Sequence, residues 1–199
     1  GAFNYSLNRD SDESWYLRSE NAYRAEVPLY ASMLTQAMDY DRILAGSRSH
    51  QTGVNGENNS VRLSIQGGHL GHDNNGGIAR GATPESSGSY GFVRLEGDLL
   101  RTEVAGMSVT AGIYGAAGHS SVDVKDDDAS RAGTVRDDAG SLGGYLNLIH
   151  DASGLWADIV ALGTRHSMKA STDNNDFRAR GWGWLGSLET GLPFSITDN

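Results

Sequence analysis

The stretch Ser60-Val61-Arg62-Leu63-Ser64-Ile65-Gln66 decides the fold, because apolar and polar residues alternate strictly along it. Alternation with a period of two indicates a β-strand that has one apolar and one polar face. Six alternating segments of this kind follow one another along the chain, at 60–71, 90–101, 107–116, 142–150, 155–164 and 182–194. Each has roughly the 9–11 residues that a tilted strand needs to cross a bilayer. The sequence therefore predicts a mainly β protein with membrane-spanning strands.

The connections between these segments are expected to alternate between long and short. The intervals 72–89, 117–141 and 165–181 are long and polar, whereas 102–106 and 151–154 have the length of tight turns. Bacterial outer-membrane barrels place short turns on the periplasmic side and long loops outside. The pattern therefore predicts an oriented, antiparallel outer-membrane β-barrel.

Charged residues of the alternating segments gather on the polar face. In a barrel this face lines the lumen, where charges pair across strands or with a central helix, while lipid contacts the apolar face. The candidate lumen residues are Arg62, Arg94, Glu96, Asp98, Asp158 and Glu189.

The region from about 20 to 47 has the period of a helix instead. Pro28 suits a first helical turn, where its missing N–H is not needed. An apolar stripe then recurs at spacings of three and four, formed by Leu29, Met33, Ala37, Tyr40 and Leu44. Because Tyr30, Leu34 and Met38 add a second apolar stripe, we expect this helix to be largely enclosed. Arg42 is its candidate partner for lumen carboxylates. Residues before the helix read as two short strands around a polar turn at 8–13.

Composition excludes several other classes of protein. The 199 residues carry a net charge of −9, which argues against nucleic acid as a partner because binding nucleic acid requires Lys and Arg. The chain has no cysteine, so it has neither disulfides nor thiolate chemistry. It has no apolar run of the roughly 18 residues that a transmembrane helix needs. No motif for a cofactor is present.

Catalytic and metal-binding readings are weaker than structural ones. His69 and His72 are expected to be polar residues at a strand end rather than metal ligands. The acidic runs 125–128 and 136–138 lack the spacing of a calcium loop and read as solvated surface loops. A hydrolase would rest only on the carboxylate cluster, chiefly Asp98 and Glu189, and no nucleophile elbow accompanies it. We therefore expect no enzyme activity and no metal site.

Short motifs in a fixed order carry a resemblance to a known family. They are Trp15-Tyr16-Leu17-Arg18-Ser19, Tyr23-Arg24-Ala25-Glu26-Val27-Pro28-Leu29-Tyr30-Ala31, Arg94-Leu95-Glu96-Gly97-Asp98-Leu99, Gly143-Gly144-Tyr145-Leu146, Leu155-Trp156-Ala157-Asp158 and Gly186-Ser187-Leu188-Glu189-Thr190-Gly191. In this order the chain resembles the C-terminal part of pertactin-like autotransporters, and the AIDA-type adhesins among them closely.

The resemblance implies three regions and a function. Residues 1–19 would be the last rung of a β-helical passenger, 20–59 a linker helix and loop, and 60–199 the first half of a twelve-stranded barrel threaded by the helix. The implied function is type V secretion, in which the barrel inserts in the outer membrane of a Gram-negative bacterium with the help of the barrel-assembly machinery. Its own adhesin passenger is then exported to the cell surface.

Two further expectations accompany this reading. Six strands are fewer than the roughly eight of the smallest single-chain barrel, so we expect the sequence to be a fragment of a longer protein. The alternative from a different class is a surface-exposed or soluble β-domain that binds carbohydrate or protein, whose apolar faces would pack against each other.

Overall fold

The computed structural model describes residues 3–12, 14–24, 26–47, 61–73, 84–125 and 130–194. The elements, in chain order, are β1 (Phe3–Arg9), β2 (Trp15–Tyr23), α1 (Glu26–Gly46), β3 (Val61–His72), β4 (Ser86–Val104), β5 (Met107–Lys125), β6 (Arg131–His150), β7 (Trp156–Ser171) and β8 (Asp176–Gly191). The expected linker loop that precedes β3 lies outside the described residues.

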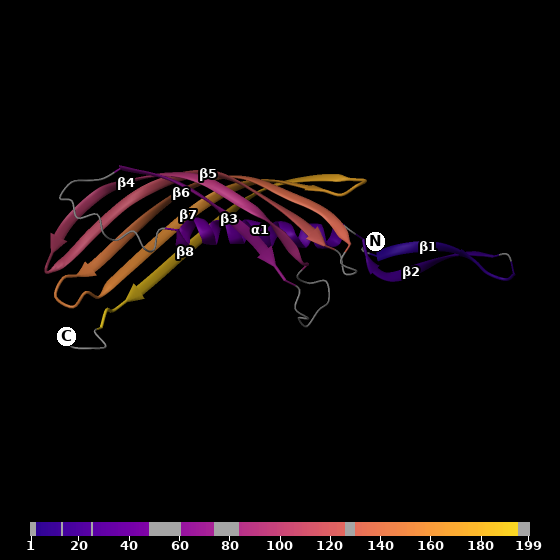
Figure 1. Ribbon diagram of the computed structural model, residues 1–199, viewed down its shortest axis with the longest axis horizontal. Coiled ribbons are helices and arrows are strands. Elements are labelled where there is room, and N and C mark those ends of the chain that lie inside the picture. Colours follow the sequence, from indigo (N-terminus) through magenta and orange to yellow (C-terminus); the bar gives the residue numbers. More distant parts are fainter. Residues whose placement is uncertain are drawn as a thin grey trace.

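Strands β3 to β8 form one sheet in which each strand pairs antiparallel with the next along the chain. This sheet is curved, and α1 lies against its concave face (Figure 1). The predicted mainly β, antiparallel architecture with one helix is therefore confirmed. In the described part of the chain the sheet is open, with β3 and β8 at its edges. Closure into a twelve-stranded barrel stays a prediction.

The two short turns occur where they were predicted. Ala105 and Gly106, both with positive φ, form the tight turn between β4 and β5. Two central residues with positive φ match the right-handed twist of a hairpin. The β6–β7 turn lies beside it, because the Asp151 amide donates a hydrogen bond to the Gly106 carbonyl, 3.0 Å away. Both turns thus lie at one end of the sheet.

Two of the three long polar loops were predicted wrongly, because most residues of 117–141 and 165–181 belong to strands. Strand β5 continues to Lys125 and β6 begins at Arg131, so that only 126–130 separate them. Strands β7 and β8 are likewise separated only by 172–175, and β3 and β4 pair as far as His72 and Ser86. Strands β4 to β8 have 16–20 residues, whereas the predicted segments have 9–13.

An inversion of polarity along each strand explains this error. In the half of β5 that follows the tight turn, Ile113 faces outward with 50% of its surface exposed, while Tyr114 faces α1 and is buried. Toward the other end the buried residues are Val122 and Val124, and the outward residue Asp123 is exposed. Alternation continues, but the polar side chains now face outward. The outward apolar band therefore ends partway along the strand.

The helix begins at Glu26 rather than near residue 20, because β2 continues to Tyr23. Pro28 lies in its first turn as predicted, and the first apolar stripe faces the sheet. The second stripe does not: Tyr30, Leu34 and Met38 are 45%, 68% and 57% exposed. The described sheet covers only one side of α1, so enclosure of the other side stays a prediction, like closure of the barrel. No described helix is long and apolar enough to span a bilayer.

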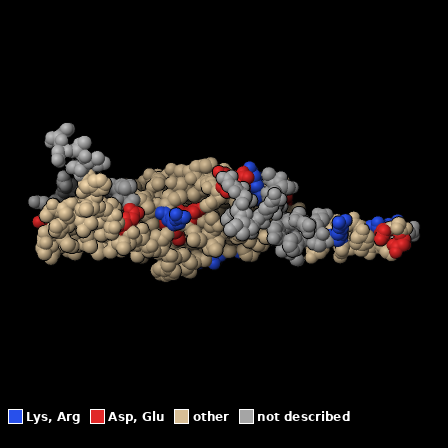
Figure 2. Space-filling model, turned by 90° about the horizontal axis from the view of Figure 1, so that it is seen from below, with Lys and Arg blue, Asp and Glu red and all other residues tan. Residues whose placement is uncertain are grey.

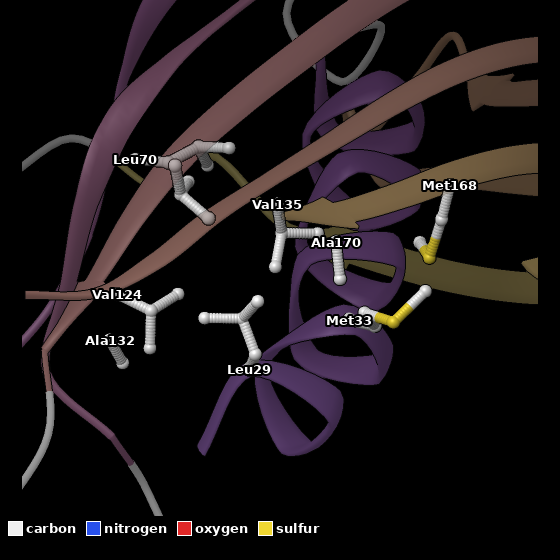
Figure 3. Close-up of a cluster of buried hydrophobic side chains, with 9 residues drawn as sticks. Leu29, Met33, Leu70, Val124, Ala132, Val135, Met168 and Ala170 are labelled. Atoms are coloured by element: carbon white, nitrogen blue, oxygen red, sulfur yellow. The ribbon is translucent and has the colours of Figure 1, made fainter. Parts of the chain in front are cut away.

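Two apolar clusters hold α1 on the concave face. In the first, Leu29 and Met33 pack among side chains from the strand ends that lie opposite the tight turns (Figure 3). These side chains are Leu70, Val122, Val124, Ala132, Val135, Met168 and Ala170. In the second, Tyr40, Leu44 and Ala45 pack against mid-strand residues, namely Phe92, Tyr114, Ala139, Tyr145, Val160 and Leu162. Burial of this apolar surface is the main force that keeps the helix on the sheet.

The first two strands form a separate hairpin, as predicted. Tyr5 pairs with Ser19 and Arg9 with Trp15 in an antiparallel register. The hairpin projects from the end of the molecule where α1 begins (Figure 1), and its side chains Leu7 and Leu17 are exposed. Its assignment to a β-helical passenger stays a prediction.

Candidate functional site: the helix–wall interface

The concave face brings three of the predicted lumen residues together. Arg94 and Glu96 are 1% and 4% exposed, and their side chains pair at 3.2 Å. Arg62, on the neighbouring strand β3, pairs with the same carboxylate at 2.7 Å. Buried charges are tolerated only when they are paired, so this ion-pair group fits the predicted cross-strand pairing in the lumen.

The same arginine also holds the end of the helix. The Arg94 guanidinium donates to the Leu44 carbonyl oxygen at 3.5 Å and to the Ser47 hydroxyl. The last carbonyls of a helix lack intrahelical donors and carry the negative end of the helix dipole. Arg94, a cation on the wall formed by strands β3 to β8, therefore supplies a hydrogen-bond donor to the C-terminal carbonyls of α1.

The remaining predicted carboxylates lie farther toward the tight turns, beyond the end of α1. Asp98 accepts hydrogen bonds from Tyr145 at 2.5 Å and Arg101 at 3.2 Å. Asp158 is buried and lies directly opposite Asn147 on one side and Glu189 on the other. These side chains make this part of the concave face polar. Their described contacts are with neighbouring side chains of the sheet, which fits ion pairing and hydrogen bonding rather than catalysis.

Asp41, and not the predicted Arg42, is the helix residue that pairs with β7. Arg42 is exposed and makes no ion pair with the described residues. The Asp41 carboxylate is 5% exposed and lies 3.5 Å from Nε2 of His166 on β7. Nδ1 of His166 lies 2.6 Å from the carboxylate of Asp137 on β6. We call these three residues the Asp41 cluster.

The position of Asp137 corrects a prediction. Residues 136–138 were expected in a solvated loop, but they belong to β6, and Asp137 is only 1% exposed. Its second carboxylate oxygen accepts a hydrogen bond from the Ser167 backbone amide at 3.2 Å. Asp138 faces outward and pairs with His119. The second acidic run, 125–128, lies mostly outside the described residues.

Further polar contacts join α1 to the wall along its length. Gln36 donates to the Ser120 hydroxyl at 2.8 Å, and Asp39 lies 2.5 Å from His72 of β3. At the first helical residue, Glu26 accepts a hydrogen bond from Asn175 at 3.2 Å. These contacts come from three different regions of the sheet, so they hold the helix from several directions.

Three wall glycines leave room for helix side chains. A Cβ at Gly133 would lie 3.0 Å from Leu29, and one at Gly118 would lie within 3.0 Å of the Tyr40 hydroxyl. A Cβ at Gly183 would lie 2.5 Å from the Asp41 carboxylate. Contacts this short cannot form without displacing the helix side chain or the strand. The wall is thus shaped to this helix.

The histidines give no evidence for a metal centre in the described part of the chain. His69 contacts the Ser87 hydroxyl and His72 contacts Asp39, so the two side chains have separate partners. Among the described residues, no group of three or more His, Asp and Glu side chains has an arrangement that could hold a metal ion. Seen from below the sheet, Lys, Arg, Asp and Glu form only small groups on a largely uncharged surface (Figure 2).

Comparison with known proteins decides the family. Residues 46–199 match the family model described as the autotransporter beta-domain. The chain belongs to the autotransporter β-domain family. This family membership confirms the predicted autotransporter of type V secretion and assigns the chain to the outer membrane of a Gram-negative bacterium.

A solved structure shares the fold of this autotransporter domain. The crystal structure of the transport unit of the autotransporter AIDA-I from Escherichia coli matches with a TM-score of 0.61 and 20% sequence identity, over 85% of this chain and 53% of that one. The chain therefore spans about half the length of that structure. At this identity the likeness supports the shared architecture of helix and antiparallel strands.

Proposed function

We propose that this chain is the part of an autotransporter that anchors and exports its own passenger. In this proposal β3 to β8 form part of the barrel wall, their convex face contacts outer-membrane lipid, and α1 lies in the lumen. The passenger precedes α1 and lies at the cell surface, and the barrel-assembly machinery assists insertion. The helix acts as tether and plug, and the chain catalyses no reaction.

The observation that carries the proposal is the distribution of apolar residues over the two faces. On the convex face large apolar side chains are exposed, including Leu63, Ile65, Leu95, Leu142, Trp184 and Leu188. A surface of this kind is unfavourable in water and favourable in lipid. On the concave face, by contrast, charged side chains are buried against a helix.

The direction of the chain agrees with this arrangement. The tight turns lie at one end of the strands, which is the periplasmic end in outer-membrane barrels. The helix begins near the β7–β8 turn at the opposite end, as the Glu26–Asn175 contact indicates. A passenger joined to the start of α1 would therefore lie outside the cell.

A soluble binding module is not favoured by this surface. That alternative requires the apolar faces to pack against each other, whereas Ile65 and Trp184 are 79% and 82% exposed in the described chain. No described contact covers them.

The test uses the complete protein, expressed with an epitope tag before Phe3 and another in the 172–175 turn. We expect both tags to be accessible to antibody and to protease on intact cells, with the protein retained in outer-membrane fractions after carbonate washing. A tag before Phe3 that is protected in intact cells, while the turn tag is accessible, would contradict passenger export. Recovery in the soluble fraction would contradict membrane anchoring.

A further inference from the structure

We propose that Asp41 is a positioning residue that fixes the depth and rotation of α1 in the lumen, through the Asp41 cluster and the space above Gly183. This inference rests on the proposed function, since it concerns how the lumen helix is held. It adds a specific polar contact that selects one depth and rotation of the helix, which burial of apolar surface alone does not do.

The cluster is deeply buried and joins four elements. Asp41 comes from α1, Asp137 from β6 and His166 from β7, and each is no more than 5% exposed. Gly183 of β8 lies beneath the Asp41 carboxylate, and a Cβ there would also approach Nε2 of His166 to 3.3 Å. The ring of Tyr40 contacts the His166 ring edge-on, with centroids 6.2 Å apart.

With both carboxylates ionised, the geometry requires a charge on the histidine. Both ring nitrogens of His166 face carboxylate oxygens, at 2.6 Å and 3.5 Å. An ionised carboxylate only accepts hydrogen bonds, and a neutral imidazole has a single N–H. An imidazolium can donate to both Asp137 and Asp41, so that one positive charge connects the wall to the helix.

The sequence of α1 offers no second residue that could make this contact. Moving the helix by one turn, about 5.4 Å, would bring Ala37 or Ala45 to the place of Asp41. The neighbours three positions away are Met38 and Leu44, which are also apolar. A shift of α1 by one turn in either direction therefore presents no acceptor to His166 at the position of Asp41.

Apolar packing alone would not select this register so strictly. The hydrophobic contribution depends on buried area and has no direction. The helix members of the two clusters also recur at helical spacing along α1, so packing alone could be satisfied in more than one register. A single buried polar contact is the kind of feature that specifies register in packed helices, at a cost in stability. Asp41 has that role here through the contact of Oδ2 with His166. The cost in stability is that Oδ1 is buried without a hydrogen-bond partner among the described residues.

The experiment measures amide hydrogen exchange of α1 and KCl conductance in planar bilayers, with the complete protein and four single variants. Asp41→Ala removes the helix carboxylate, and Asp41→Asn keeps an acceptor oxygen without the charge. Gly183→Ala removes no polar group but fills the space that the Asp41 carboxylate occupies. Gly181→Ala is the matched control, because it lies on the same strand and face and its Cβ would meet no atom within 4 Å.

We expect Asp41→Ala and Gly183→Ala each to raise α1 amide exchange at least about tenfold and to increase channel opening. Asp41→Asn should give a smaller rise, and Gly181→Ala none. The Asp41→Ala/Gly183→Ala double variant should exchange no faster than Asp41→Ala, because the added methyl group then has no carboxylate to displace.

Two results would overturn the inference: equal exchange in Gly183→Ala and Gly181→Ala, or additive effects of Asp41→Ala and Gly183→Ala. Heat-modifiable migration on gels verifies that each variant has inserted, and Gly183→Ala remains decisive if Asp41→Ala does not insert. Failure of the proposed function would differ, because the wild-type helix itself would then show unprotected amides and an open pore.

Discussion

Val93 and Arg94 are neighbours on β4, yet they lie on opposite faces of the sheet and have opposite environments. Val93 is 44% exposed on the convex face, and Arg94 is 1% exposed on the concave face. In a water-soluble protein the reverse arrangement would be expected. The comparison agrees with the proposal that lipid contacts the convex face, while α1 and paired charges replace water on the concave face.

The two faces therefore depend on different interactions. The convex face needs only an apolar surface that matches the bilayer, so the identity of each apolar residue matters little. The concave face needs specific partners, because a buried charge that loses its partner retains the full cost of desolvation. Substitutions on the concave face should consequently have larger and more residue-specific effects.

The largest effect is expected for Glu96→Leu. This change leaves Arg94 buried and removes the carboxylate that both Arg94 and Arg62 contact. Breaking a buried ion pair in this way costs about 3–5 kcal/mol. The free energy of unfolding by denaturant, measured in lipid vesicles, should fall by this amount.

Two variants sharpen this prediction. Glu103→Gln, on the exposed end of the same strand, should change the free energy of unfolding by less than about 0.5 kcal/mol. Adding Arg94→Met to Glu96→Leu should recover part of the loss, since replacing both partners removes the unpaired charge. A loss that the second substitution deepens would contradict the role assigned to the pair.

A smaller effect is expected for a charge placed on the convex face. Ile159→Arg introduces a cation in the apolar band of β7, where lipid contact costs about 2–4 kcal/mol at the membrane midplane. Ser167→Arg, also exposed and outward on β7, lies beyond the apolar band and should cost about 0–1 kcal/mol. The same unfolding measurement checks both, and equal losses would show that the apolar band is not the lipid-contacting surface.

The sequence allowed the half of each strand that carries the outward apolar band to be predicted, because apolar and polar residues there alternate in the sense expected for a barrel. It also allowed the Arg62–Glu96–Arg94 pairing to be anticipated, since these residues share one face. The other half of each strand was not predicted, and Ser121-Val122-Asp123-Val124-Lys125 of β5 is an example. This segment also alternates, but its charged residues resemble those of a loop unless the inversion of polarity is considered.

The Asp41 cluster was missed for a related reason. Asp137 and His166 lie in the two intervals that were predicted as long loops, so their burial could not be inferred. Asp41 lies beside Arg42 on the helix, and the positive residue was the more obvious partner for a lumen rich in carboxylates. The register between strands, which places Ala139 opposite His166 and brings Asp137 within reach, is set by pairing over the whole sheet.

The smallest effect concerns Glu26, which lies at the beginning of α1 and outside both faces of the comparison. A hydrogen bond from its own backbone amide lowers the pKa of its carboxyl, with further contributions from Asn175 and Arg24. A carboxylate there also stabilises the positive end of the helix dipole. Because the pKa is lower in the folded state, the stabilisation is present above the unfolded-state pKa near 4.5 and is lost as pH falls through the folded pKa. Glu26→Gln should therefore reduce the free energy of unfolding by about 0.3–1 kcal/mol at pH 7 and by less at pH 3. A loss that is the same at both pH values would show that the carboxylate charge does not contribute, and that the helix is held at this end by its apolar contacts alone.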